Sequence, residues 1–308
     1  MQLLSNTSRL IFFGLLLKSL TLPCFALEFT PRLWSHIPIG LNFAGVAYAD
    51  TEADIAVNPV TMLEDVDMEL EIWAGKYIRT FELLDKSVRI DLTQAYIQGE
   101  WTGLLEGVPA SAYRSGFSDT FVRFAVNLYG APPLSVKEFA AYKLSKEIDT
   151  VVGVALAVRL PTGQYKDDKL INLGQNRFIF RPQLGVTHTR GKWTTEVTGE
   201  VAFHTDNDDF NNGQTLEQDP TYIIHAHLVH TFRPGLWLGS SIAYDYVGEN
   251  SINGVNSDNE RENFGWSLNF AYPINRQSGF NVAYIATRRQ KTTGLDSDTL
   301  AASLSFSW

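Results

Sequence analysis

Nine side chains that could bind or orient a solute occur at alternating positions along the chain, among small and polar residues. Arginine can bind anionic groups, carboxylates can bind cations, and imidazole can titrate near neutral pH or bind a metal. The nine are Arg123, Arg159, Arg177, Arg181, Glu196, Glu200, His225, His227 and Asp245. If they face a common interior, a basic wall opposite an acidic wall would orient polar or ionised solutes. The alternative is that these charges neutralise each other in a narrow, partly filled interior.

The segments that carry these residues alternate with a period of two and are about ten residues long. The clearest is LAASLSFSW at residues 300–308, where apolar side chains alternate with Ala and Ser. Residues 193–203, 236–246, 266–272 and 280–287 repeat this alternation. Such a period predicts β-strands with one apolar and one polar face. Burying arginine in lipid costs roughly 2–4 kcal/mol at mid-depth, so an interior is the natural place for the nine residues.

The pattern favours a membrane barrel, with its apolar face toward lipid, over a soluble sandwich. Tight turns at residues 190–192, 233–235 and 275–278 alternate with long polar connections at 205–220, 248–263 and 290–299. Short turns on one side and long loops on the other are typical of bacterial outer-membrane barrels. The last strand also ends on an aromatic residue, so Leu304, Phe306 and Trp308 are expected to form the signal that the barrel-assembly machinery reads.

We therefore predict an all-β, antiparallel transmembrane barrel of about twelve strands, with ten or fourteen as alternatives. At Ala74–Gly75 the alternation shifts phase, which predicts a β-bulge. Near residues 135–146, Ser135 and Glu138 have capping-box spacing, which predicts a short amphipathic helix at the periplasmic mouth, either as a surface helix or as a plug. The predicted strands are 36–48, 65–82, 87–101, 117–129, 149–161, 175–189, 193–204, 221–233, 235–247, 263–274, 279–289 and 298–308.

Residues 1–26 are expected to be a cleaved signal peptide, which leaves residues 27–308 as the barrel. Arg9 precedes the short apolar run LIFFGLLL, and Cys24-Phe25-Ala26 resembles a cleavage site. The run is too short for a membrane anchor, and the residues before Cys24 do not suit a lipoprotein signal. Cys24 is the only cysteine among 308 residues, so a disulfide framework is excluded.

Two segments resemble a known family. They are FSDTFVRFAVNLYGAPPL at residues 117–134 and LPTGQY with LINLGQNRFIFRPQLG within residues 160–185. They are similar to the outer-membrane proteins named for the meta-pathway (MetA-pathway) of phenol degradation. The resemblance covers nearly all of residues 27–308 and implies an outer-membrane barrel, often labelled a transporter, near aromatic catabolism. It implies no catalytic residues.

The sequence gives little indication of catalysis or of metal binding. No Gly-x-Ser-x-Gly, P-loop, dinucleotide fingerprint or His-Glu-x-x-His occurs, so an enzyme is not expected. His225 and His227 share one strand face, but no third metal ligand lies beside them, and residues 206–213 do not fit an EF-hand loop. We expect no cofactor and no metal site. His230 points outward, so a lipid-acting hydrolase remains an alternative.

The expected function is passive uptake of small solutes, aromatic or hydrophobic compounds among them. A non-transporting barrel, either structural or a lipid-acting hydrolase, is the second hypothesis. The expected partners are outer-membrane lipid and lipopolysaccharide, the barrel-assembly machinery and small-molecule solutes. The net charge of −9 argues against a nucleic-acid partner, which would select a basic surface.

Overall fold

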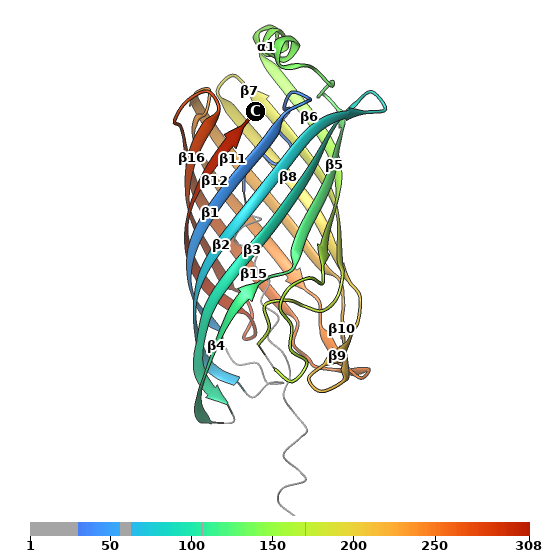
Figure 1. Cartoon of the computed structure of the whole chain (residues 1–308), viewed down its shortest axis with the longest axis vertical. Helices are drawn as coiled ribbons and strands as arrows, with labels where there is room; N and C mark the ends of the chain where they lie inside the picture. The colour runs from blue at the N-terminus through green and yellow to red at the C-terminus, as the bar shows by residue number, and fades with distance from the viewer. Residues whose placement is uncertain (1–29, 56–62, 106, 170) are drawn as a thin grey trace, which may run out of the picture.

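The chain folds into a closed antiparallel barrel. The computed structural model describes residues 30–55, 63–105, 107–169 and 171–308. Its strands wind obliquely around one axis (Figure 1), and β1 pairs with both β2 and β17, which closes the wall. The wall strands are β1 (Asn42–Ile55), β2 (Leu63–Leu83), β3 (Lys86–Leu105), β4 (Val108–Phe117), β5 (Thr120–Tyr129), β6 (Ile148–Leu160), β7 (Ile179–Arg190), β8 (Trp193–His204), β11 (Thr221–Arg233), β12 (Leu236–Val247), β15 (Arg261–Pro273), β16 (Ser278–Arg289) and β17 (Leu295–Ser307).

The wall has twelve positions because β4 and β5 follow one another along the same neighbour, β3. β4 pairs with the second half of β3 and β5 with the first half. The barrel type, the antiparallel order and the count of twelve strands are therefore confirmed. We call the end that holds Asn42, Ser307 and the short connections the turn end, and the opposite end the loop end. Helix α1 and the carboxyl terminus lie at the turn end (Figure 1).

Most strands lie where the alternation predicted them, and β8 and β11 match the predicted ranges. The first strand was predicted too early, at 36–48, whereas β1 begins at Asn42 and extends to Ile55. Residues 30–41 form no strand and enter the barrel instead. The predicted signal peptide, residues 1–26, lies outside the described residues.

The long connections at the loop end form a second, small sheet. Its strands are β9 (Asn207–Phe210), β10 (Gln214–Gln218), β13 (Asn250–Ile252) and β14 (Val255–Asn256). Phe210, Leu216 and Ile252 are buried together beneath it. The segment at 206–213, which lies in a connection predicted to be long and polar, is therefore partly packed.

The outward face of the barrel is apolar over most of its height. Leu184, Ile224, Ile242 and Leu268 come from four different strands and are each 50–56% exposed. The inward face of the same strands carries buried polar side chains such as Thr187, Asn269 and Ser241. In water this arrangement would expose far too much apolar surface, whereas lipid accommodates it.

The predicted bulge at Ala74–Gly75 was wrong, and the phase shift there has another cause. The pairing of β2 with β1 and β3 runs through both residues without a register change. Ile72 is 2% exposed and faces inward, whereas Trp73 is 54% exposed and faces outward. Toward the loop end the outward positions of β2 become acidic, at Glu71, Glu69 and Asp67.

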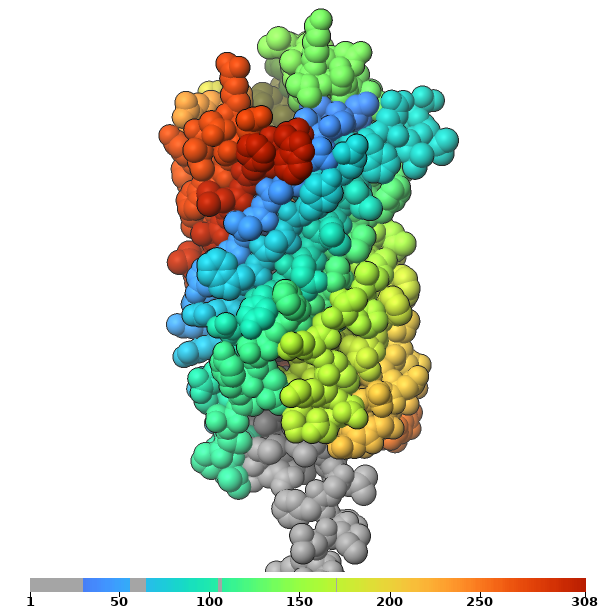
Figure 2. All heavy atoms as spheres, viewed as in Figure 1, coloured from blue at the N-terminus to red at the C-terminus, as the bar shows by residue number. Residues whose placement is uncertain are grey.

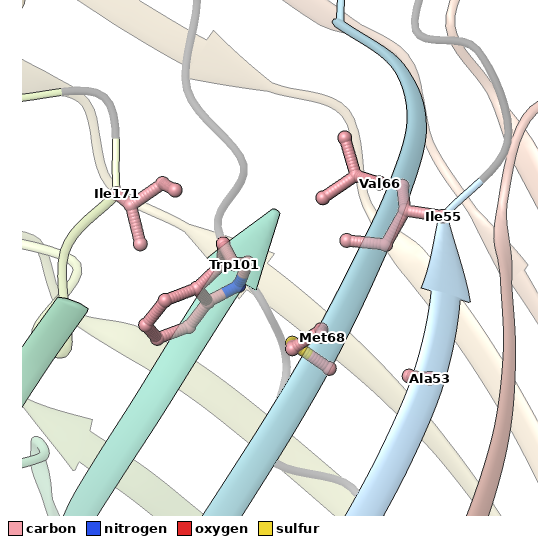
Figure 3. Packing of buried hydrophobic residues seen from close by; sticks show 6 residues of the cluster. All are labelled: Ala53, Ile55, Val66, Met68, Trp101 and Ile171. Atoms are coloured by element: carbon pink, nitrogen blue, oxygen red, sulfur yellow. The ribbon is translucent and has the colours of Figure 1, made fainter. Parts of the chain in front are cut away.

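The change from apolar to acidic residues on the outer face of β2 marks the edge of the apolar band. The outer face passes there from lipid to water, while the strand pairing continues unchanged. The inward positions beyond Trp73 are apolar and pack against each other and against the loop that follows β6 (Figure 3). The cluster consists of Ala53, Ile55, Val66, Met68, Trp101 and Ile171. At this end, therefore, the wall is built like a soluble sheet, with carboxylates outside and an apolar interior.

Helix α1 (Val136–Ser145) begins at the N-cap Ser135 with the capping box in place. None of its residues is buried, and it stands beyond the rim at the turn end (Figure 1). Two of its side chains contact the segment that enters the barrel, because the ring of His36 lies edge-on to Phe139 and Tyr142, with centroids 4.8 and 5.3 Å away. The described residues include no helix that is long and apolar enough to cross a membrane.

The loop after β6 fills the wall beside β4. β4 pairs with β3 on one side only, and on its other side Gln164 donates its backbone N–H to the carbonyl of Phe117 at 2.8 Å. Arg114 Nε donates to the carbonyl of Ile171 at 3.0 Å. In the space-filling view the yellow-green atoms of this loop lie directly against green β4 (Figure 2). The loop therefore takes the place of a further strand pairing.

Candidate lumen site

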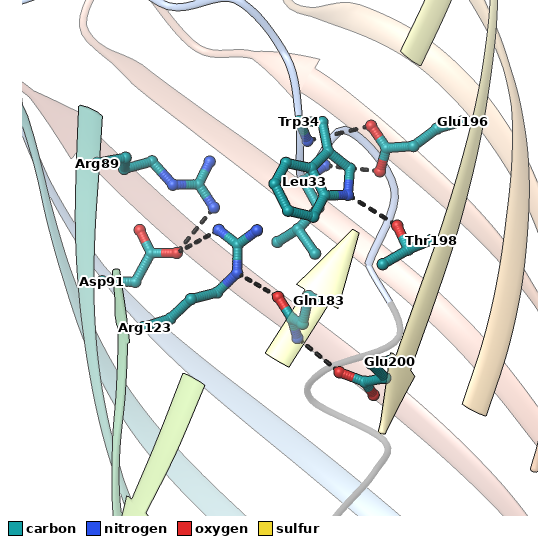
Figure 4. Close-up of polar contacts among 9 residues, drawn as sticks. All are labelled: Leu33, Trp34, Arg89, Asp91, Arg123, Gln183, Glu196, Thr198 and Glu200. Atoms are coloured by element: carbon teal, nitrogen blue, oxygen red, sulfur yellow. Dashed lines mark hydrogen bonds and ion pairs between the residues drawn. The ribbon is translucent and has the colours of Figure 1, made fainter. Parts of the chain in front are cut away.

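Residues 30–41 occupy the lumen and are held there by Glu196 of β8. The Glu196 carboxylate accepts the backbone N–H of Leu33 at 2.9 Å and that of Trp34 at 3.2 Å (Figure 4). Thr187 of β7 donates its hydroxyl to the same carboxylate at 2.7 Å. A buried carboxylate that receives three donors is well satisfied, so Glu196 fixes the segment to the wall.

The side chain of Trp34 crosses the lumen and is 2% exposed. Its Nε1 donates to the hydroxyl of Thr198 at 2.8 Å, and the guanidinium of Arg123 lies 4.6 Å from its ring centre. Gly153 and Gly185 face the indole, and a Cβ on Gly185 would lie 1.9 Å from Trp34 Nε1. The two glycines therefore make room for an aromatic ring that no local sequence pattern places there.

A chain of polar contacts runs across the lumen from β3 to β8 (Figure 4). Asp91 accepts from Arg89 at 2.7 Å and pairs with Arg123 at 3.4 Å. Arg123 Nε donates to Gln183 at 2.7 Å, and Gln183 donates to Glu200 at 2.6 Å. Arg181 forms an ion pair with Glu200. Buried charges are stable only when they are paired in this way.

A cavity of about 130 Å³ lies in the lumen on the loop-end side of this chain of contacts. Its wall includes the apolar side chains of Leu33, Phe121, Ile223 and Ile285. An apolar cavity of about 150 Å³ holds one benzene molecule, so this space is close to the size of a single aromatic ring. A second recess of about 460 Å³ lies at the turn end, and Thr30 lines both spaces.

The structure places six of the nine predicted residues on the wall of the lumen cavity of about 130 Å³. The six are Arg123, Arg159, Arg181, Glu200, His225 and Asp245. Glu196 instead binds residues 30–41, which we call the inner segment. His227 pairs with the hydroxyl of Ser241 at 2.7 Å. Arg177 was predicted on a strand, but β7 begins only at Ile179, and Arg177 instead donates to Gln218 near the loop end.

The charges do not form two separated walls. β7 and β8 are neighbours, and their register sets Gln183 opposite Glu200. Arg181, two residues from Gln183 on the same face, can therefore reach Glu200 directly, which is the neutralised arrangement considered as the alternative. His225 and His227 have ring centres 5.3 Å apart, and no group of three or more metal-binding side chains is present among the described residues.

The two sequence segments that carry the family resemblance meet in space. Asp119, between β4 and β5, accepts the backbone N–H of Gly163 and that of Gln175, both at 2.9 Å. Gly163 and Gly174 approach so closely that a Cβ on either would lie within 3 Å of backbone atoms. Asp119 thus joins the loop after β6 to the bend between β4 and β5. The side chain of Asp119 also lines the lumen cavity.

Sequence reasoning missed several residues of this site, namely Trp34, Asp91, Asp119, Phe121 and Gln183. Asp91 and Gln183 lie on inward positions of predicted strands, so their parity could have found them. Trp34 could not have been found in that way, because it lies in no strand and its partner Thr198 is 164 residues away.

Comparison with solved structures agrees with this fold. The chain is 19% identical to the COG4313 outer membrane channel from Pseudomonas putida F1, with a TM-score of 0.75 over 91% of this chain and 99% of that one. The translocator domain of the autotransporter NalP from Neisseria meningitidis is 8% identical, with a TM-score of 0.48 over 89% of this chain and 90% of that one. No curated protein matches the sequence.

A family model described as "Putative MetA-pathway of phenol degradation" matches residues 50–297. The match includes both resembling segments, Asp119 and all nine predicted lumen residues. Because it spans well over half of the sequence, the chain belongs to the family of the MetA-pathway of phenol degradation.

Proposed function

We propose that the barrel lies in the outer membrane and carries small solutes passively across it, monoaromatic compounds among them. The observation that carries this proposal is the lumen cavity of about 130 Å³, which is close to the size of one ring and is partly lined by Leu33, Phe121, Ile223 and Ile285. The family membership adds a context of aromatic catabolism. The turn end would face the periplasm and the loop end the outside, as in other barrels of this type.

The inner segment limits what can pass. Thr30 of this segment lines both larger spaces and Trp34 is buried in the lumen beside them, so a wide aqueous pore is not expected. A solute of ring size would enter the cavity from the loop end and pass when residues 30–41 shift. Large hydrophilic solutes such as disaccharides would be excluded by size.

The test is uptake by liposomes that carry the purified, refolded barrel. Phenol and benzyl alcohol should enter faster than into empty liposomes, and a disaccharide should not. The W34A variant should raise the rate for the ring compounds, whereas W193A, on the lipid face, should leave it unchanged. If a folded wild-type barrel gave no uptake of any ring compound, the proposal would be wrong.

The hydrolase alternative needs a nucleophile beside His230. The ring of His230 instead packs edge-on against Trp193 and Phe232, with centroids 4.6 and 4.7 Å away. Both side chains are apolar, so they offer no group for acyl transfer. A lipase assay on the refolded protein in lipid tests this alternative directly, and activity that survives H230A would exclude His230 as the base.

A further inference from the structure

A small recess in the lumen, nearer the loop end than the ring-sized cavity, is strongly cationic. It has a volume of about 40 Å³ and is lined by Arg159 of β6, Arg181 of β7 and Arg261 of β15. The other polar side chains on its wall are uncharged or weakly basic, namely Gln175, His204, Gln218 and Thr221. No aspartate or glutamate is among the lining residues that the structure describes.

The larger cavity beside it has a different charge balance. Its lining includes four basic side chains, Lys76, Arg123, Arg159 and Arg181, and four acidic ones, Asp91, Asp119, Glu200 and Asp245. The side chains of the larger cavity would therefore stabilise a bound anion little, whereas those of the recess would stabilise it much more. Because both spaces lie inside the barrel, this difference is screened less than it would be at a surface.

Arg261 has unused hydrogen-bonding capacity. Its Nε is buried and has no hydrogen-bond partner among the described residues, and the same is true of the Gln175 side-chain oxygen on the same wall. Behind the recess, Arg177 holds Gln218 in place and keeps its own Nε and Nη1 without hydrogen-bond partners in the part of the chain described. Buried donors without partners are rare and costly, so they point to a ligand that accepts hydrogen bonds.

The recess and the larger cavity are adjacent, because Arg159 and Arg181 line both. On the cavity side, the guanidinium of Arg181 lies 5.9 Å from the ring centre of Phe121. The combined space is therefore a small cationic end joined to a ring-sized, partly apolar body. Guanidinium groups bind carboxylates with two parallel hydrogen bonds, which fits a planar anionic group at the cationic end.

We propose that the solute bound in the lumen is a monoaromatic carboxylate, with its carboxylate in the arginine recess and its ring in the larger cavity. This proposal rests on the proposed uptake function and specifies its substrate class. It makes Arg261 a specificity residue, because Arg181 already forms an ion pair with Glu200, whereas no such ion pair is found for Arg261 among the described residues.

The experiment compares three solutes in liposomes that carry the full-length barrel. Benzoate has both the ring and the carboxylate, benzyl alcohol has the ring alone, and acetate has the carboxylate alone. Wild-type protein should take up benzoate fastest. R261Q should slow benzoate uptake roughly tenfold or more and leave benzyl alcohol unchanged, because one charge-assisted contact is lost. R190Q, at the exposed last residue of β7, which lines neither the recess nor the larger cavity, is the matched control.

The outcomes separate the two proposals. If benzyl alcohol enters and benzoate is no faster, or if R261Q slows both solutes equally, the carboxylate proposal is wrong and uptake stands. If acetate matches benzoate, the recess binds any small anion and the aromatic part is wrong. If no solute enters, the uptake function itself fails.

Equilibrium dialysis of benzoate against the barrel in detergent gives an independent readout. Binding should weaken with rising salt and by roughly tenfold in R261Q, with partial recovery in R261K. If R261Q does not fold, the wild-type comparison of benzoate with benzyl alcohol and acetate decides the question, and equal affinities for benzoate and benzyl alcohol would overturn the proposal.

Discussion

The carboxylate of Glu196 accepts the backbone N–H of Trp34 at 3.2 Å, which joins two residues 162 positions apart. This contact, with its neighbour at Leu33, holds the inner segment across the lumen. The segment rather than a constriction of the wall therefore decides whether the lumen is open.

Replacing Glu196 with Gln should loosen the inner segment. The amide keeps one acceptor but loses the charge that strengthens its three hydrogen bonds, so we expect a destabilisation of the segment by about 1–3 kcal/mol. Hydrogen exchange at the Leu33 and Trp34 amides should speed up accordingly. E82Q, at an exposed position near the turn end, should not change these rates, and equal exchange in E196Q and wild type would contradict this role.

Replacing Glu200 with Gln should change ion selectivity instead. Glu200 lines the cavity and neutralises Arg181, so its removal leaves an unbalanced guanidinium there. Reversal potentials across a planar bilayer should shift toward anions in E200Q. Glu196 does not line the cavity, so E196Q should shift them less. An unchanged reversal potential in E200Q would show that ions do not pass this cavity.

The G185A substitution should displace the Trp34 ring. The added methyl group would lie 1.9 Å from Nε1, so the indole must move or the strand must shift, at a cost of about 1–3 kcal/mol. G199A, on the next strand, is the matched control because no atom lies within 4 Å of its added methyl. Thermal unfolding should show a lower midpoint for G185A alone, together with changed tryptophan fluorescence.

Acidification should weaken the contact between α1 and the inner segment. Burial lowers the pKa of the His36 imidazole below its ordinary value of about 6.5, and the hydrogen bond to the Pro132 carbonyl opposes this only in part. The neutral form is therefore the one that packs against Phe139 and Tyr142. Stability from this contact is complete above pH ~6.5 and is lost as pH falls through the lowered pKa.

The measurement is protease cleavage after Lys137 and Lys143 of α1 as a function of pH. Cleavage should rise at acidic pH in wild type, and the H36Q variant should lose this pH response. H188Q, on the barrel wall, should retain it. A pH response that persists in H36Q would assign it to another group.

Replacing Glu69 with Gln should stabilise the barrel at low ionic strength. Glu69 on β2 lies directly opposite Glu52 on β1 and Glu100 on β3, so three carboxylates share one row on the outer face. Like charges directly opposite one another destabilise a sheet, by roughly 0.2–1 kcal/mol for each pair. The gain should disappear in 1 M salt, and a gain that is independent of salt would show that packing is the cause.

The alternation of side chains was enough to predict the barrel. In residues 300–308 every second residue is apolar, and in residues 193–204 the apolar residues Trp193, Val197 and Phe203 share one face. The structure turns that face outward in both strands. Parity also placed Arg123, Glu200 and His225 inside, because side-chain direction alternates strictly along a strand.

The change between Ile72 and Trp73 shows the limit of that reasoning. The sequence reveals a change of apolar face at this point, but a bulge and a change of surroundings produce the same pattern. The unbroken pairing of β2 with both neighbours shows that there is no bulge, so the pattern reflects the change from lipid to water outside the strand. Where the lipid ends along a strand depends on the tilt and stagger of the whole barrel, which no single strand contains.

The occupied lumen was likewise decided by the tertiary structure. Trp34 is positioned by Glu196, Thr198 and Gly185, which lie on two neighbouring strands far along the chain. The sequence by itself determined which side chains face inward. The register between strands and the path of residues 30–41 decided which of these inward side chains pair and which remain available to a solute. They also decided how much space is left in the lumen. The sequence could not show this, because these contacts form only when the barrel closes.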